Sequence, residues 1–259
     1  MKSRLIELSV ENSIALLTIN NPPLNILSHA LLLELKDNIK KLKADKRVRV
    51  IIITGKGKFF GAGADIKELS TLKTKKDGKK FVKEGQAILN LIESLGKPVI
   101  AVINGPCIGG SNELAMACHL RIASDEAWFS QPEINLGLIP GFGGTQRLPR
   151  LIGKARAMEI ILTGGKITAL DAFAIGLVNK VVKGERLIEE AKALAENIGS
   201  KGILSIKACL EAVNIGIDMS LKKGLDKEAR LFGRLCETED KEEGISAFIE
   251  KRVPRFKDK

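Results

Sequence analysis

Lys97 to Arg150 reads KPVIAVINGPCIGGSNELAMACHLRIASDEAWFSQPEINLGLIPGFGGTQRLPR, and the rest of the chain is organised around this stretch. Its continuous apolar run, Val99 to Ile103, predicts a strand that is buried on both faces. Turn residues end the run at Asn104-Gly105. Gly109-Gly110 then opens a short predicted helix, Ser111 to Ala117, of mostly small and apolar residues.

Two carboxylates stand in these apolar surroundings. Glu113 is the one charge inside the predicted helix, and Glu133 follows Pro132 just before another segment rich in Gly and Pro. Taken alone, Glu113 could simply stabilise the helix dipole, and Glu133 could be a solvated loop residue. Together, a buried strand, a glycine turn, a helix N-terminus and two carboxylates indicate an active site.

Length and composition limit the class of protein. A chain of 259 residues with 44% hydrophobic residues predicts one large domain, or a domain with an appendage. The N-terminus, MKSRLIELSV, has no long apolar core, and no stretch is apolar enough to span a membrane, so we expect a cytoplasmic protein without membrane contact. The cysteines form no CxxC pair and are interpreted as reduced core residues rather than zinc ligands; they are Cys107, Cys118, Cys209 and Cys236.

The net charge of +11 is open to three interpretations. The first is a solvated basic surface, the second is binding of a polyanionic small molecule, and the third is binding of nucleic acid. The Lys residues cluster in Lys36 to Arg49 and in Lys73 to Lys83, both on predicted helix faces without interleaved aromatics for base stacking. This pattern disfavours nucleic acid as a partner.

A β/α core followed by an all-helical tail describes the rest of the pattern. A hairpin is predicted at Leu5 to Val10 and Ile14 to Ile19. Ser28 is the expected N-cap of an amphipathic helix. The other predicted strands are Val48 to Thr54 and Val178 to Val182, and the other predicted helices are Ile66 to Leu72, Phe81 to Leu95, Arg156 to Leu162, Ala169 to Ala174, Arg186 to Ile198, and Gly202 to Glu250 with breaks at Gly216 and near Glu237.

The glycine loops do not match nucleotide-binding motifs. Gly55, Gly57 and Gly61 follow a predicted strand with GxGxxxG spacing, and the next segment is another glycine loop rather than an amphipathic helix. The dinucleotide fingerprint therefore fails, and no GxxxxGK[ST] motif is present.

Four segments together resemble the enoyl-CoA hydratase/isomerase, or crotonase, family. They are FFGAGADIKEL (59–69), GGSNELAMA (109–117), QPEINLGLIPGFGGTQRLPR (131–150) and EGISAFIEKR (243–252). The resemblance runs nearly end to end and is closest to short-chain enoyl-CoA hydratases. It implies an α/β spiral core of β-β-α turns over residues 1–200 and a C-terminal helical trimerisation region over residues 201–259, assembled as a homotrimer or a dimer of trimers.

The resemblance also assigns the reacting groups. The two backbone N–H groups that hold the thioester carbonyl would be those of Ala64 and Gly110, where small residues let the backbone approach the ligand. Glu113 and Glu133 would hold one water molecule between them, Glu113 activating it for addition to C3 and Glu133 donating a proton to C2. Two carboxylates in an apolar pocket repel each other, so we expect them to retain one proton and to titrate as a pair.

Coenzyme A would account for part of the basic charge. The resemblance implies phosphate contacts from Lys58 and, from a neighbouring subunit, Lys251. It places Ala62, Asp65 and Ile66 along the adenine and pantetheine path, a ring from the adjacent protomer at Phe248, and the opposite wall at Asn25, Ile26 and Leu27. No bound cofactor or metal is expected beyond the coenzyme A thioester substrate itself.

Two positions depart from the family pattern. The family usually has glycine where Ser111 stands and Asp where His119 stands. Ser111 could narrow the acyl pocket or form a hydrogen bond near the water, which leaves the preferred chain length open. No functional role follows for His119.

The sequence therefore predicts a hydro-lyase that adds water reversibly to 2-trans-enoyl-CoA in fatty-acid β-oxidation. A branched-chain enoyl-CoA hydratase is an alternative that the sequence does not separate from it. A Δ3,Δ2-enoyl-CoA isomerase is disfavoured because isomerases of this fold commonly keep only the later glutamate. An RNA-binding protein with a hydratase fold is the alternative from another class, and steep salt dependence of RNA binding would identify it.

Overall fold

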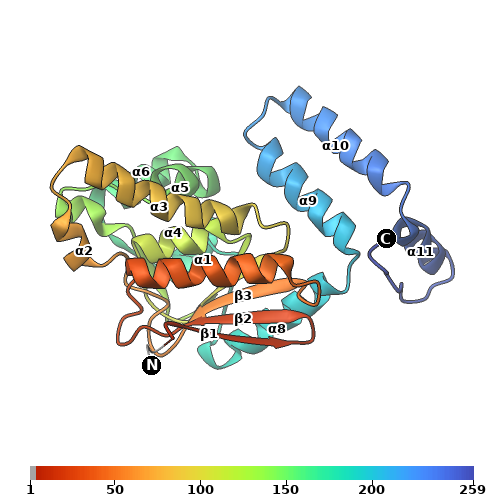
Figure 1. The fold of residues 1–259 in the computed structure, drawn as a ribbon, viewed down its shortest axis with the longest axis horizontal. Coiled ribbons are helices and arrows are strands. Elements are labelled where there is room, and N and C mark those ends of the chain that lie inside the picture. The colour runs from red at the N-terminus through yellow and green to blue at the C-terminus, as the bar shows by residue number, and fades with distance from the viewer. Residues whose placement is uncertain (1–3) are drawn as a thin grey trace.

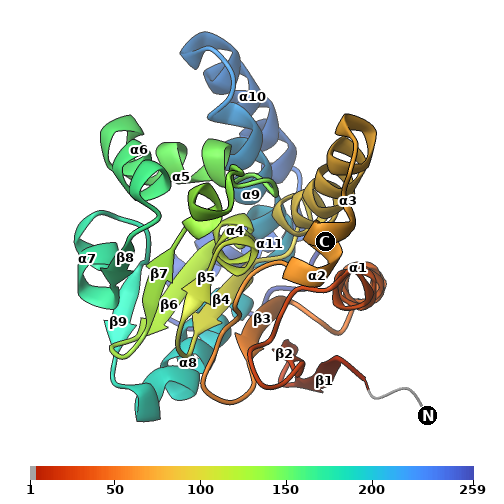
Figure 2. The same cartoon turned by 90° about the vertical axis from the view of Figure 1, so that its left-hand side faces the viewer.

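Residues 4–259 are described by the computed structural model of the protein. Six strands form one twisted sheet in the order β1-β2-β3-β4-β6-β9 (Figure 2). Its first two strands are the predicted antiparallel hairpin, and every later pair is parallel. The strands are β1 (Ile6–Glu11), β2 (Ile14–Ile19), β3 (Val50–Gly55), β4 (Val99–Ile103), β6 (Leu120–Ser124) and β9 (Lys180–Val182).

Side chains alternate between the two faces of this sheet and bury both of them. On one face, Ile52 and Val102 pack with α8 (Leu187–Gly199). On the other face, Ile51 and Ala101 join the larger core beneath the helices α1 (His29–Ala44), α3 (Lys75–Glu93) and α4 (Gly110–Ala117). This double covering explains why β3 and β4 are continuous apolar runs, as predicted from the sequence.

A second sheet has three short strands, which flank α4 and the segment of Glu133 in the sequence. It has the order β5-β7-β8, formed by β5 (Cys107–Ile108), β7 (Trp128–Ser130) and β8 (Lys166–Thr168). These strands were not predicted, because two or three residues are too few to show a period in the sequence. The remaining elements of this region are α2 (Ile66–Thr71), the 3₁₀ helix η1 (Pro132–Leu136), α5 (Gly144–Ile152), α6 (Lys154–Thr163), α7 (Ala169–Ala174) and the 3₁₀ helix η2 (Gly184–Arg186).

The last helices lie to one side of the core (Figure 1). They are α9 (Ile203–Gly216), α10 (Leu221–Leu235) and α11 (Glu239–Ile249). Arg49, just before β3, fixes the start of this region by donating hydrogen bonds to the carbonyls of Gly199 and Lys201 and by pairing with Asp258. Large apolar side chains on these helices are exposed in the single chain, among them Val213, Ile217, Leu221, Phe232, Phe248 and Ile249.

Most predicted helices are present, and the differences have local causes. Ser28 caps α1 as expected by accepting a hydrogen bond from Leu31 N. By contrast, α3 begins at Lys75 rather than Phe81, because Thr74 and Asp77 form a capping box ahead of the amphipathic part. Helix α5 was missed because its sequence starts with glycine and contains Pro149.

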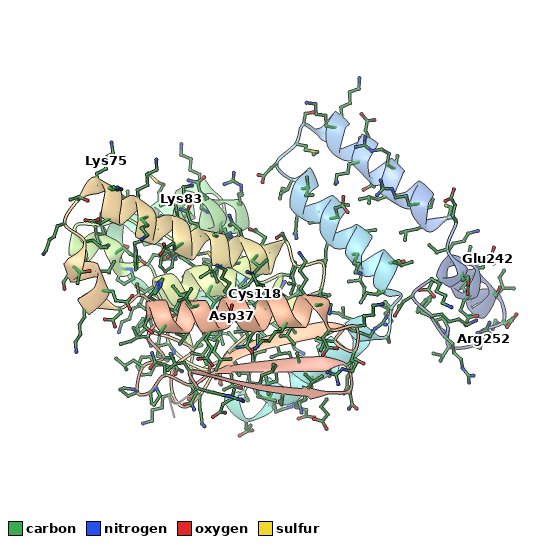
Figure 3. All side chains as sticks on the ribbon, in the orientation of Figure 1. Asp37, Lys75, Lys83, Cys118, Glu242 and Arg252 are labelled. Atoms are coloured by element: carbon green, nitrogen blue, oxygen red, sulfur yellow. The ribbon has the colours of Figure 1, made fainter. Side chains whose placement is uncertain are left out.

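The lysines of 73–83 follow α3 and its N-terminal approach, and Lys75 and Lys83 point away from the body of the protein (Figure 3). The prediction that this basic cluster occupies a helix face is thus confirmed. The interpretation of all the cysteines as core residues is only half right: Cys107 and Cys118 are buried, whereas Cys209 and Cys236 are exposed on the C-terminal helices.

Candidate active site

A cavity of about 300 Å³ lies where the N-terminus of α4 meets α3, η1 and the loop before α5. The four residues that the sequence assigned to the chemistry all line it: Ala64, Gly110, Glu113 and Glu133. Most of the remaining wall is apolar, contributed by Leu69, Leu72, Phe81, Val82, Leu138, Ile139, Pro140 and Phe142. The fold therefore brings residues that are far apart in the sequence into one pocket with a polar end.

The turn that opens α4 depends on glycine. Gly109 has φ +51° and ψ −124°, a conformation that disfavours residues with a side chain. A Cβ at this position would also lie 2.7 Å from Glu133 Oε1. Gly109 therefore allows both the sharp entry into the helix and the close approach of the second carboxylate.

Two backbone N–H groups at this helix N-terminus are available to bind an oxygen atom of a ligand. Within residues 4–259, neither Ala64 N–H nor Gly110 N–H donates a hydrogen bond. They are neighbours, since a Cβ placed on Gly110 would lie 3.5 Å from Ala64 N. Unpaired N–H donors beside a helix N-terminus favour a partial negative charge on a bound oxygen.

Glu113 is buried beneath the loop that leads into α5. Its Oε1 accepts a hydrogen bond from Gly144 N at 2.6 Å, and the residue is 2% exposed. Burial and, to a lesser extent, the charge of Glu133 raise the pKa of Glu113 to about 8, although hydrogen bonds from the backbone of Gly144 and Phe142 act to lower it. Glu113 can therefore hold a proton near neutral pH.

Glu133 stands on η1 and lines the same cavity as Glu113. Burial raises the pKa of this carboxyl as well. With its amide nitrogen turned toward Glu133, Gln131 donates to both carboxylate oxygens at 3.1 and 3.2 Å. Two carboxyls with raised pKa values, Glu113 buried and held by a backbone N–H and Glu133 partly buried and held by an amide, form a pair that retains a proton.

Phe142 and Arg147 position the loop above Glu113, and sequence reasoning missed both. The Phe142 ring fills the space left by Gly85 of α3 and stacks at 5.4 Å from the ring of Phe81. Arg147 donates to Phe142 O at 3.0 Å and is itself held by Glu93 and Asn90. Gly85 and Phe142 are far apart in the sequence and meet only in the folded protein. The one sign of their contact in the sequence is a glycine inside an amphipathic helix.

The side chains expected along coenzyme A are in varied surroundings. Ile66 and Lys58 are exposed, and Asp65 caps α2 by accepting from Lys67 N. Asn25 and Leu27 are buried, and the Asn25 amide donates to Lys56 O and Phe59 O. Ile26 and Ala62 are partly exposed, whereas Phe248 and Lys251 are exposed at α11. These assignments stay predictions.

The two departures from the family pattern have structural explanations. Ser111 does not line the cavity; its hydroxyl accepts a hydrogen bond from Gly63 N at 3.1 Å. His119 Nδ1 accepts from Val99 N at 3.0 Å, so Nε2 carries the proton and donates to Glu93 O at 3.1 Å. Burial lowers the pKa of His119, which keeps the ring neutral in this bridge between α3 and β4.

A larger cavity, of about 630 Å³, lies between the C-terminal end of α3 and α9, away from the two glutamates. Its buried lysine, Lys97, already donates to Leu42 O and Asp45 O at 2.6 Å. No cluster of three or more His, Cys, Asp or Glu side chains within residues 4–259 is arranged to hold a metal ion. Over the same residues, no helix has both the length and the apolar character needed to cross a membrane.

Comparison with known proteins agrees with this geometry. The profile of the family described as enoyl-CoA hydratase/isomerase matches residues 9–259. A "probable enoyl-CoA hydratase" of Bacillus subtilis is 47% identical over 97% of this chain and 98% of its own. A crotonyl-CoA hydratase of Syntrophomonas wolfei is 45% identical over 96% of both chains.

Solved structures extend the likeness to the fold. An enoyl-CoA hydratase from Bacillus anthracis superimposes with a TM-score of 0.94 at 39% identity, covering 99% of this chain and 100% of the other. An enoyl-CoA hydratase subunit from Geobacillus kaustophilus gives a TM-score of 0.95 at 36% identity over the whole of both chains. The crotonase fold expected from the sequence is therefore confirmed, and the chain belongs to the enoyl-CoA hydratase/isomerase family.

Proposed function

We propose that this protein is an enoyl-CoA hydratase that adds water reversibly to 2-trans-enoyl-CoA and forms 3-hydroxyacyl-CoA, as in fatty-acid β-oxidation. One observation carries the proposal: a buried and a partly buried carboxylate line the same largely apolar cavity as two backbone N–H groups that donate no hydrogen bond within residues 4–259. Hydration of an enoyl thioester needs hydrogen-bond donors to the carbonyl oxygen and groups that transfer protons. The oxyanion donors accept the charge that develops on the carbonyl oxygen, and the carboxyls handle the protons.

The thioester carbonyl would accept hydrogen bonds from Ala64 N–H and Gly110 N–H. As hydroxide adds to C3, negative charge moves onto this oxygen and forms an enolate, which these donors and the α4 N-terminus stabilise. One such donor is typically worth about 2.7–4 kcal/mol of the activation barrier. The apolar wall would hold the acyl chain and exclude further water.

The two glutamates supply a base and an acid with one proton between them. Glu113 holds the shared proton at rest, so hydration proceeds from the form in which that proton has passed to Glu133. In that form, Glu113 takes a proton from the water whose oxygen bonds to C3, and Glu133 gives its proton to C2. The pair still carries one proton afterwards, now on Glu113, which is the arrangement that dehydration requires. Burial favours this singly protonated pair, because two charged carboxylates in one apolar pocket repel.

The substrate and the assembly are part of the same proposal. The acyl-CoA phosphates would bind Lys58 and, from another copy of the chain, Lys251. In the single chain, Phe248 is 85% exposed on α11, which favours a homotrimer or a dimer of trimers in which the C-terminal helices are covered. We expect this enzyme to act in the cytoplasm, without a membrane or nucleic acid as partner.

Replacement of each glutamate by glutamine tests the mechanism. Glu113→Gln and Glu133→Gln are nearly isosteric, so each variant should fold and bind thioester. Each should lose hydration of crotonyl-CoA by at least about 10²–10⁴-fold, the usual contribution of a general acid or base. Because the pair acts as a unit, the double variant should be far less than multiplicatively worse.

The rate of Glu113→Gln decides the reaction type. A hydration rate within a few-fold of the unmodified protein would refute the two-glutamate mechanism. Retained isomerisation of a 3-enoyl-CoA together with weak hydration in the unmodified protein would instead identify an isomerase. Exchange of the C2 proton with solvent should depend most on Glu133.

A further inference from the structure

The loop that carries Ala64 is held by backbone N–H hydrogen bonds at each of the four residues before it, Phe60 to Gly63. Phe60 N and Gly61 N donate to Pro106 O at 3.1 and 3.2 Å, and Ala62 N donates to Leu24 O at 3.0 Å. The next donor is Gly63 N, and its acceptor is a side chain, the Ser111 hydroxyl. Ala64 N–H follows and has no acceptor among residues 4–259.

Gly63 is the residue whose torsions orient that free donor, because Ala64 N–H and Gly63 C=O belong to one planar peptide unit. Gly63 has φ +88°, in a region where glycine has wide freedom. Its carbonyl accepts from Leu27 N at 2.8 Å, and its N–H donates to Ser111 at 3.1 Å. Both ends of this flexible residue are therefore fixed, one of them by Ser111.

Ser111 is fully buried in the first turn of α4, directly after the other oxyanion donor, Gly110. Its hydroxyl fits against Gly61. A Cβ added at Gly61 would overlap Ser111 Oγ and lie 2.9 Å from Ser111 Cβ. Gly61 and Ser111 thus share one space, and a side chain at one position requires a smaller residue at the other.

We propose that Ser111 is a positioning residue for the oxyanion hole: it fixes Gly63 and thereby aims Ala64 N–H, and Gly61 is glycine to admit its hydroxyl. This inference rests on the oxyanion role proposed above for Ala64 and Gly110. It assigns a task to the residue that departs from the family's glycine. Ser111 joins the two segments that carry the donors, so that each segment holds the other in place.

The first test is Ser111→Ala, which removes the acceptor and keeps the Cβ. Turnover of crotonyl-CoA should fall about tenfold. This loss is smaller than the loss of about 10²–10³-fold that is typical when an oxyanion donor is deleted, because Ala64 N–H remains and only its direction changes. KM should change by less than about threefold, because the misaimed donor matters most when charge develops on the oxygen. Turnover within twofold of the unmodified protein would overturn the inference.

A paired substitution separates the hydrogen bond from packing. Gly61→Ala alone should lose stability or folded protein through the overlap with Ser111. Gly61→Ala with Ser111→Gly should regain much of the lost thermal midpoint, with the remainder due to the contact of the added Cβ with Asn25 O at 3.0 Å. The double variant should keep the low turnover of Ser111→Ala, since Gly63 N–H still lacks its acceptor. Full recovery of turnover in the double variant would show that space alone matters, and would refute the positioning role.

Gly110→Pro keeps this inference distinguishable from the proposed function. It removes the other donor and should lower turnover at least about a hundredfold. If Gly110→Pro is fully active with an intact fold, the carbonyl binds elsewhere and the proposed site fails together with this inference. If Gly110→Pro is inactive while Ser111→Ala turns over normally, the proposed site stands and only the role of Ser111 is refuted.

Discussion

Two glycines of α3, Gly78 and Gly85, should respond in opposite ways to alanine. A Cβ on Gly85 would overlap the Phe142 ring, with Cζ at 2.8 Å. A Cβ on Gly78 would have no atom of residues 4–259 within 4 Å beyond its chain neighbours and the backbone of its own helix. Phe142 is 2% exposed, and its far side already meets Gly110, where an added Cβ would be 3.3 Å from the ring. The ring therefore has little room to retreat.

The difference in the free energy of unfolding between the two variants can be estimated because both glycines lie in the same helix, α3. Alanine in place of glycine inside a helix is worth about 0.5–1 kcal/mol, so Gly78→Ala should raise the free energy of unfolding by about that amount. Gly85→Ala gains the same helix preference but adds an overlap that costs about 1–3 kcal/mol in a packed core. The helix contribution cancels between the variants, which leaves a gap of about 1–3 kcal/mol.

Urea unfolding of both variants at one protein concentration measures this gap, since assembly makes stability depend on concentration. Where unfolding is irreversible, the thermal midpoints should differ by about 2–4 °C for each kcal/mol. Gly85→Ala should also slow hydration, because Phe142 belongs to the loop whose Gly144 N–H holds Glu113. Equal stability of the two variants, within about 0.5 kcal/mol, would refute the packing argument.

Further predictions concern the pH dependence of activity and stability and the oligomeric state. Hydration should slow as pH rises above about 8, when the glutamate pair loses its last proton; a rate that keeps rising beyond this pH would contradict the shared proton. Between pH 4.5 and about 8 the folded state holds a proton on Glu113 that the unfolded chain has lost, so stability should fall as pH rises through this window, and Glu113→Gln should lessen the fall in denaturant titrations. Light scattering should show a trimer or hexamer, because α10 and α11 expose Leu221, Phe232 and Phe248; a dilute, active monomer would overturn this.

The sequence predicted best those elements whose side chains follow a regular period. Leu31, Leu35 and Ile39 mark one face of α1, and all are fully buried. The unbroken apolar runs of β3 and β4 likewise marked a sheet covered on both faces. The strands β5 and β8 were missed, because their short pairings are decided by neighbours elsewhere in the chain.

In the candidate site, too, the sequence predicted the features with a local pattern and missed those that depend on contacts between distant segments. Glu113 and Glu133 could be singled out as charges in apolar segments, and the family resemblance paired them with Ala64 and Gly110. Their meeting in one cavity, with raised pKa values for both carboxyls, required the fold. Ser111 was expected near the acyl chain or the water, but it points to the loop of Gly63, a contact between segments 48 residues apart that leaves no local pattern.

The anchored loop before Ala64 has a consequence for the entropy of binding. Its N–H groups are bonded within the protein from Phe60 through Gly63, so the backbone has already lost its conformational freedom on folding. A thioester that enters need not order this segment again. The entropic cost of forming the complex then falls mainly on the acyl-CoA, whose long flexible arm must be immobilised.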